Sequence, residues 1–165
     1  MYSVEIKSKE EMKIIGFVLR TTFLQNLQAE EIPPFFHKVM EAKTLKSVPN
    51  RANNNQICVI DRKADSPEFS YYMGVEVNNY DEIPEGMETI TIPASNFAVA
   101  SFTKRGNKDV LMAVKHITEI WIPENEYTED HQKPGCIYYD ESFITGYEGQ
   151  GYEGNLTAKV FIPVK

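Results

Sequence analysis

Cysteine is scarce in this chain: only Cys58 and Cys136 occur, far apart and each inside an apolar run. One disulfide would use both, but two buried free thiols fit such surroundings better. An apolar run of about 18 residues, long enough to cross a membrane, is also missing. The first thirteen residues carry charge throughout and lack the apolar segment of a secretory signal peptide. These absences predict a cytoplasmic protein that does not enter a membrane.

Basic residues are in the minority: 17 Lys and Arg stand against 24 Asp and Glu, which gives a net charge of −7. The densest basic cluster is Lys104-Arg105 with Lys108. Because nucleic-acid affinity depends on Lys and Arg neutralising phosphates, this balance predicts no direct nucleic-acid partner. An acidic chain suits cationic ligands instead. A length of 165 residues corresponds to a single domain, residues 1–165.

Motifs for metals, nucleotides and nucleophiles are absent or incomplete. The three histidines are not spaced as metal ligands, and no G-x-S-x-G motif occurs. Gly149, Gly151 and Gly154 match G-x-G-x-x-G, but the expected following element is a strand, and nearby glutamates would repel phosphate. We therefore expect no cofactor and no metal.

The segment 146–154 contains GYEG twice and has four glycines in nine residues. Ordering so many glycines is entropically costly. The segment is interpreted as a mobile hairpin loop, and the alternative is a lid over a nearby pocket.

Hydrophobic periodicity predicts two strands, a helix and two strands, and then the same order again. In the first helix Pro33 or Pro34 is expected in the first turn, and in the second Asn107 is the expected cap and Pro123 the boundary. The expected strands lie around 4–6 and at 14–19, 56–61, 69–77, 88–92, 96–103, 136–140 and 156–164, and the helices around 32–40 and 107–121.

This repeated order predicts an α+β fold with a mostly antiparallel sheet. The polar segment 78–87 separates two similar halves, about 1–78 and 87–165. Two such modules side by side leave a crevice, which is a common place for a ligand.

Adjacent tyrosines occur on strands of both halves: Tyr71 with Tyr72, and Tyr138 with Tyr139. Neighbouring strand residues point to opposite faces, so one member of each pair can pack under the helices while the other faces the crevice. Aromatic walls with few polar groups suit flat, hydrophobic ligands, cationic ones included. Ordinary sheet packing explains the same pattern.

Several short segments occur in a characteristic order and spacing: Tyr71–Val77, Ile92–Ala94, Phe97–Val99, Gly106, Ile120–Pro123, Glu126–Tyr127, Tyr139–Phe143 and Phe161–Lys165. Through these segments the chain resembles the GyrI-like, or AraC-type effector-binding, domain over nearly its whole length. The resemblance implies two β-α-β-β modules related by a pseudo-twofold axis, with two long helices on one side of the sheet and a central crevice.

The resemblance also implies ligand-binding residues. Tyr71 matches a tyrosine before the family's strand glycine, and Trp121 matches the tryptophan at the helix end. Tyr139 matches the tyrosine of the family's Glu-x-Tyr, while Ile137 stands where the glutamate that meets cationic ligands is usual. The predicted ligand-binding residues are thus Tyr71, Trp121, Ile137 and Tyr139, and the loss of the carboxylate favours a neutral or weakly polar ligand.

Three functions follow. The first is a stand-alone bacterial small-molecule binding protein, tied to multidrug binding, transcription regulation or toxin sequestration, without the helix-turn-helix of many relatives. The second is a hydrolase of small electrophiles, as in some relatives, in which Glu76, Glu119 or Glu148 replaces the missing carboxylate. The third is a protein-binding inhibitor of the gyrase-inhibitory type.

Overall fold

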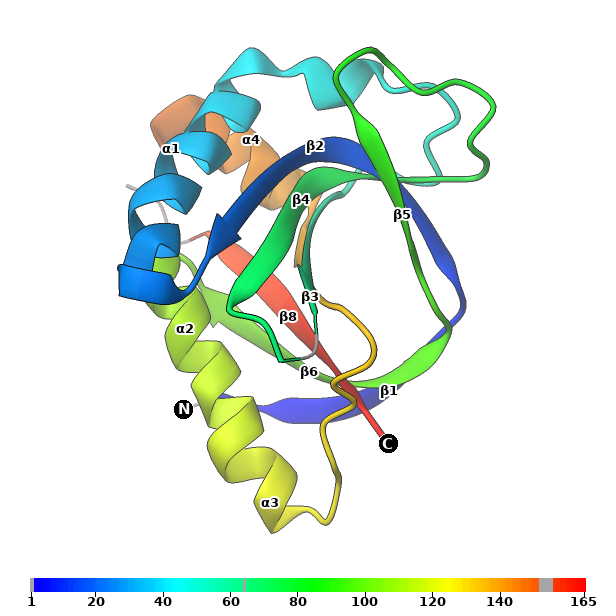
Figure 1. Ribbon diagram of the computed structural model, residues 1–165. Coiled ribbons are helices and arrows are strands. Elements are labelled where there is room, and N and C mark those ends of the chain that lie inside the picture. Colours follow the sequence, from blue (N-terminus) through cyan, green and yellow to red (C-terminus); the bar gives the residue numbers. More distant parts are fainter. Residues whose placement is uncertain (1, 64, 152–155) are drawn as a thin grey trace.

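The computed structural model describes residues 2–63, 65–151 and 156–165. Eight strands and the helices that cover them alternate along the chain (Figure 1). The strands are β1 (Val4–Lys9), β2 (Met12–Thr22), β3 (Gln56–Arg62), β4 (Glu68–Val77), β5 (Glu88–Ile92), β6 (Ser95–Thr103), β7 (Gly135–Tyr139) and β8 (Thr157–Val164). The helices are α1 (Leu27–Ala42), α2 (Asn107–Lys115), α3 (Ile122–Glu124) and α4 (Glu141–Gln150), with 3₁₀ turns η1 (Leu24–Asn26) and η2 (Thr44–Ser47) and a π-helical turn η3 (His116–Trp121).

The strands form one antiparallel sheet in the order β1-β6-β8-β7-β3-β4-β2-β5. If each strand from β1 to β4 is exchanged with its counterpart from β5 to β8, the order is reversed and every neighbour is kept. The two modules therefore meet at three places: β3 pairs with β7 in the middle of the sheet, and β1 and β5 each pair with a strand of the other module, β6 and β2. The predicted α+β class with two related modules is confirmed. The division at 1–78 and 87–165 stays a prediction, which this strand order supports.

The sheet is strongly bent (Figure 1). Gly16 in β2 lies directly opposite Gly74 in β4. A Cβ atom on Gly74 would collide with the backbone oxygen of Ile15, and one on Gly16 would collide with Met73. Only glycine allows the two backbones to approach this closely.

Each face of the sheet buries its own apolar cluster. One cluster lies under the helices and includes Tyr71 and Tyr139. The other lies on the opposite face and includes Tyr72, with Tyr138 packed against it. The predicted alternation within the two tyrosine pairs is thus present, and the members expected to bind a ligand lie under the helices.

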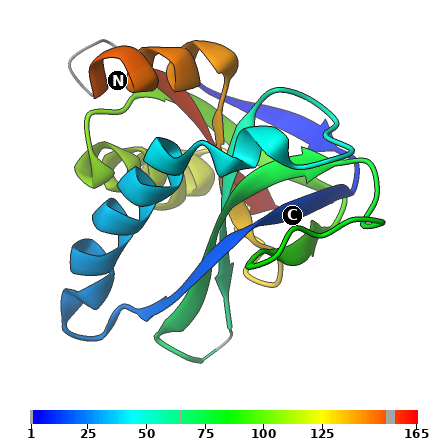
Figure 2. The same cartoon turned by 90° about the horizontal axis from the view of Figure 1, so that it is seen from above.

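The helices gather on one side of the sheet, as both views show (Figures 1 and 2). Helix α1 begins at Leu27, so Pro33 and Pro34 lie inside it and not in its first turn as predicted. Gly106, and not Asn107, caps α2, and the last turn passes Pro123 to end at Glu124.

The prediction of a hairpin loop at 146–154 is wrong for its first part, because residues 146–150 belong to α4. Residues 152–154 lie outside the described residues. Two local contacts favour this helix: the Asp140 side chain accepts a hydrogen bond from the backbone N–H of Phe143 at 2.9 Å, and Phe143 and Ile144 are buried. Tertiary packing therefore outweighs the poor helix propensity of glycine.

Cys58 and Cys136 are both buried free thiols, as predicted. Within the described ranges, no helix is long and apolar enough to cross a membrane. The same part of the chain contains no cluster of three or more His, Cys, Asp or Glu side chains that could hold a metal ion.

Candidate functional site

A buried lysine lies among aromatic rings under the helices. Lys104 follows the last residue of β6, is only 1% exposed, and donates from Nζ to the Tyr139 hydroxyl at 2.9 Å. Its Nζ also lies 3.6 Å from the centroid of the Phe36 ring and 4.8 Å from that of Tyr139. A cation over an aromatic face at this range is attracted by the ring quadrupole. The chain thus places a cation of its own inside an aromatic cage.

The environment of Lys104 disfavours its charge. Burial lowers the pKa of Lys104 to about 8, while the Asp109 carboxylate acts in the opposite direction to a smaller extent. At neutral pH the ammonium form therefore still predominates. Lys104 thus places an ammonium group in the interior, where the resemblance to the family leads one to expect a carboxylate.

The cage continues toward β3 and β4. Tyr71 donates from its hydroxyl to Cys58 Sγ at 3.1 Å, and its ring meets that of Phe35 edge-on. Burial raises the pKa of the Cys58 thiol, and Lys104 and the two tyrosine hydroxyls offset this only in part. Cys58 is therefore a neutral core thiol and not a nucleophile.

The four predicted ligand-binding residues lie in or against one apolar cluster. Tyr71, Ile137 and Tyr139 belong to the buried cluster under the helices, and Trp121 packs at its margin. Ile137 lies between Cys58 and Val160 of the neighbouring strands, while Trp121 stacks on the ring of Tyr127 at 5.6 Å. The first three thus share a face of the sheet with Lys104 and its cage.

Two open cavities lie between the predicted halves, and none of these four residues lines either of them. The larger, of about 390 Å³, runs between α1 and α4 and reaches Tyr147. The smaller, of about 310 Å³, runs between the segment 46–56 and α4. Tyr147 lines the larger cavity and also contacts the lysine cage, because its ring meets Phe36 edge-on and stacks with Phe143.

Of the three carboxylates considered for catalysis, Glu148 alone lines these cavities. Its oxygens accept hydrogen bonds from Lys46 at 2.7 and 2.8 Å, and Lys43 lies 3.6 Å away. The hydrogen bond from Lys46 is the main cause of the lowered pKa of Glu148. A carboxylate held ionised in this way is a poor general acid.

Sequence reasoning named Lys104 only as part of a surface-like basic cluster. The one signal that it is buried is its place directly after the apolar strand that ends at Phe102 and Thr103. Tyr147 was noticed only within the glycine-rich repeat, although it lies on the same helix face as Phe143. Contacts between β6, α1 and α4 bring these residues together, and no local pattern encodes such contacts.

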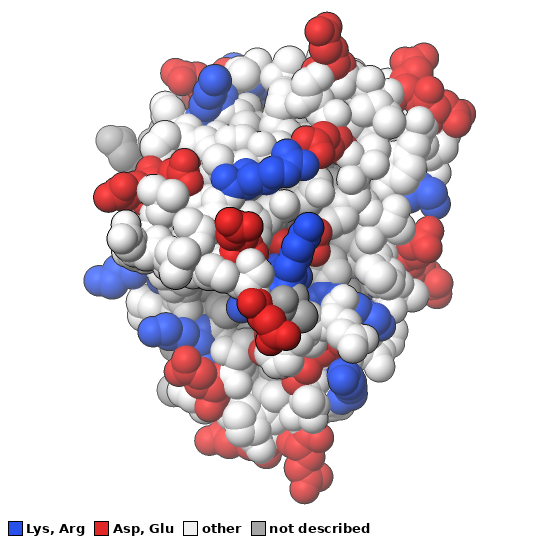
Figure 3. All heavy atoms as spheres, in the orientation of Figure 1, with Lys and Arg blue, Asp and Glu red and all other residues white. Residues whose placement is uncertain are grey.

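Charges of both signs alternate on the surface shown in Figure 3, and neither sign forms a broad patch there. That face therefore shows no broad acidic patch that could imitate nucleic acid toward a basic partner.

Residues 5–164 match the family model of Cass2, the integron-associated effector binding protein. The chain belongs to this family of effector-binding proteins, which is GyrI-like, so the resemblance found in the sequence is confirmed. Among curated proteins no match was found.

Solved structures share the fold at low sequence identity. SAV2435 bound to tetraphenylphosphonium has a TM-score of 0.76 and 15% identity, over 99% of this chain and 94% of that one. A putative bacterial transcription regulation protein from Staphylococcus aureus MU50 has a TM-score of 0.73 and 14% identity, over 99% and 98%. An integron cassette protein from the mobile metagenome of Vibrio cholerae has a TM-score of 0.67 and 11% identity, over 99% and 97%.

Proposed function

We propose that this protein binds small lipophilic aromatic molecules that are neutral or anionic, in the interior under α1 and α4. Tyr71, Ile137 and Tyr139 form walls of this site, and Trp121 flanks it. The observation that carries the proposal is the ammonium group of Lys104 inside the aromatic cage. A second cation there would meet a like charge at low dielectric, whereas an anion or a polarisable neutral ring would not.

The ligand reaches this interior through the cavity of about 390 Å³. The Tyr147 ring lines this cavity and meets Phe36 edge-on, so this side chain has to move for a ligand to reach the cage. Binding of this kind serves either effector sensing in transcription regulation or the sequestration of a toxic compound. Membership of an effector-binding family supports a binding role, and the ion-paired state of Glu148 speaks against the hydrolase alternative.

Tetraphenylphosphonium and tetraphenylborate test the proposal, because they have nearly the same shape and opposite charge. In calorimetric titrations at neutral pH, the wild-type protein should bind the borate at least tenfold more tightly than the phosphonium, a difference of about 1.4 kcal/mol. Lys104→Met removes the charge at similar length and should abolish or reverse this preference. The control is Lys108→Met, because Lys108 is exposed on α2 and its loss should leave the preference unchanged.

Tighter binding of the phosphonium by the wild-type protein would overturn the proposal. An equal preference in wild type and Lys104→Met would do the same, because the selectivity would then not originate at Lys104.

A further inference from the structure

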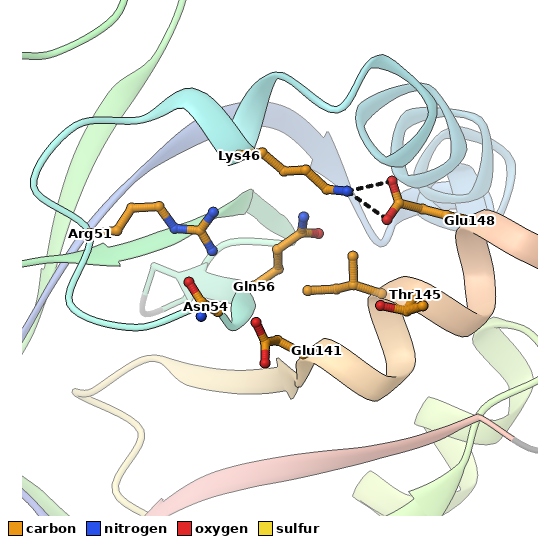
Figure 4. Close-up of a pocket in the computed structure, with 8 residues that line it drawn as sticks. Lys46, Arg51, Asn54, Gln56, Glu141, Thr145 and Glu148 are labelled. Carbon is orange, nitrogen blue, oxygen red and sulfur yellow. Dashed lines mark hydrogen bonds and ion pairs between the residues drawn. The ribbon is translucent and has the colours of Figure 1, made fainter.

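The cavity of about 310 Å³ is a second concave site, and it shares no residue with the lysine cage. The first half of the chain contributes side chains from η2, the following loop and β3, and the second half contributes one face of α4 (Figure 4). The lining residues are Lys46, Arg51, Asn54, Gln56, Glu141, Ile144, Thr145 and Glu148. Its volume is near the lower end of the range for small-molecule sites.

Two buried polar atoms at this cavity have no hydrogen-bond partner among residues 2–63, 65–151 and 156–165. Gln56 is only 4% exposed, and its side chain projects into the middle of the lining residues (Figure 4). Among the described residues, neither Gln56 Oε1 nor Arg51 Nε has a hydrogen-bond partner. Leaving a buried polar atom unpaired costs about 1–3 kcal/mol. One atom is an acceptor and the other a donor, so together they fit a molecule that carries both a donor and an acceptor.

The guanidinium of Arg51 is held in a fixed orientation. Its two terminal nitrogens donate to the backbone oxygens of Leu45 at 3.4 Å and Asn55 at 3.0 Å. Burial lowers the pKa of Arg51, and the Glu141 carboxylate opposes this shift. No ion pair joins Arg51 to a carboxylate within the part of the chain that the structure describes. The site therefore presents an oriented positive charge that has no direct counter-ion.

The negative charge of Glu141 lies at the start of α4, across the cavity from Arg51 (Figure 4). The other two charges, Lys46 and Glu148, neutralise each other through hydrogen bonds of 2.7 and 2.8 Å. A simple anion would be attracted by Arg51 but repelled by Glu141. A simple cation would be attracted by Glu141 but repelled by Arg51. Only a ligand with both charges satisfies the two sides at once.

We propose that this cavity binds a small zwitterion of the α-amino-acid class. The carboxylate of the ligand lies toward Arg51, and its ammonium lies toward Glu141 and Gln56 Oε1. Asn54, Thr145 and the remaining capacity of Gln56 favour a ligand with a polar side chain.

L-Glutamine and its two half-charged analogues are the probes. Glutaramate lacks the ammonium group, and 4-aminobutanamide lacks the carboxylate. In calorimetric titrations of the full chain, L-glutamine should bind at least tenfold more tightly than either analogue. Glu141→Gln should weaken the binding of L-glutamine at least tenfold and reduce the preference for L-glutamine over glutaramate. Arg51→Gln should reduce the discrimination against 4-aminobutanamide.

Glu124→Gln is the matched control, because it neutralises an exposed carboxylate on α3, away from this cavity, and should leave binding unchanged. Arg51 also donates hydrogen bonds to two backbone oxygens, so its replacement can impair folding. Glu141 is exposed and is given no such bond in the described part of the chain, so the Glu141→Gln variant is the one that tests the proposal. The proposal is overturned if L-glutamine does not bind at millimolar concentration, if either analogue binds as well, or if Glu141→Gln binds like wild type.

Discussion

The charge of Lys104 is buried at a cost, since a lysine with 1% exposure has lost nearly all contact with water. The Tyr139 hydroxyl and the faces of Phe36 and Tyr139 offset only part of that cost, because the pKa of the amine still falls. A group that destabilises the fold and is nevertheless placed at the centre of an aromatic cage fits a role in recognition better than a role in stability.

Replacing Lys104 by Met should change how stability depends on pH. In the unfolded chain a lysine titrates near 10.4, and in the fold Lys104 titrates at about 8. Between these values the unfolded state binds more protons, so the wild-type protein gains stability as pH rises through this window. The free energy of unfolding of wild type minus that of Lys104→Met should therefore increase by about 2.5 kcal/mol from pH 8 to pH 10.4.

Urea denaturation of both proteins at several pH values measures this difference, and the comparison cancels most of the titration of other groups. The ¹³C chemical shift of Lys104 Cε gives the pKa independently. A difference that does not vary with pH would show that Lys104 is hydrated and that the cage does not hold its charge out of water.

Strands β2 and β4 approach each other most closely at the pair Gly16 and Gly74, where backbone atoms occupy the space of a side chain. The two strands are paired along their length and curve together (Figure 1). A glycine whose neighbours are backbone atoms differs from one beside a flexible side chain, because the backbone of a central strand cannot move aside without breaking its ladder.

Gly74→Ala should lower the free energy of unfolding by about 3 kcal/mol, at the upper end of the usual cost of overpacking. Gly149→Ala is the control: no atom of the described residues lies within 4 Å of an added Cβ there, and a helical glycine replaced by alanine should stabilise by about 0.5 kcal/mol. Chemical denaturation separates the two cases. A Gly74→Ala protein as stable as wild type would mean that the two strands can separate freely at this pair.

The fold could be predicted from the sequence because its signals are local and repeated. Every strand of the sheet was expected within a few residues of its observed bounds, since alternation and apolar runs depend on near neighbours. The prediction failed at α4, where glycine content indicated a loop, and the cap at Asp140 with the burial of Phe143 decided otherwise.

The site was less predictable for the same physical reason. Tyr71, Ile137 and Tyr139 were placed on one face by simple alternation. The burial and the surroundings of Lys104 and Gln56, in contrast, depend on residues elsewhere in the chain. Lys104 lies against Phe36 and Tyr139, and Gln56 lines a cavity with Arg51 and α4. From the sequence alone, a lysine after a strand and a glutamine at the start of a strand are indistinguishable from ordinary surface residues.

The strand order of the whole molecule reads the same in both directions once β1–β4 are exchanged with β5–β8. Lys13, near the start of β2, pairs with Val77, and Asn96, near the start of β6, pairs with Val164. The ends of β4 and β8 thus occupy matching places, as do the beginnings of β5 and β1. Residues 78–87 already span the gap from β4 to β5, so a copy of that segment has the length needed to join Val164 to Val4.

A circular permutant should therefore fold. In this variant, a second copy of residues 78–87 joins Val164 to Val4, and the chain is opened between Val77 and Glu88. We expect circular dichroism and urea denaturation to show the wild-type secondary structure and one cooperative transition. Insoluble or molten protein would mean that the order of synthesis, and not only the symmetry of pairing, is needed to form the sheet.

If the permutant folds, the molecule has no obligatory first half. Either module can leave the ribosome first and wait for the other, because the pairings of β3 with β7, β1 with β6 and β2 with β5 form only when both are present. These three pairings are then the last to form during folding, and an isolated module would be expected to form them with another copy of itself. The two modules of this single chain would in this way assemble as the two subunits of a dimer do. The ligand sites would form only after the two modules have joined.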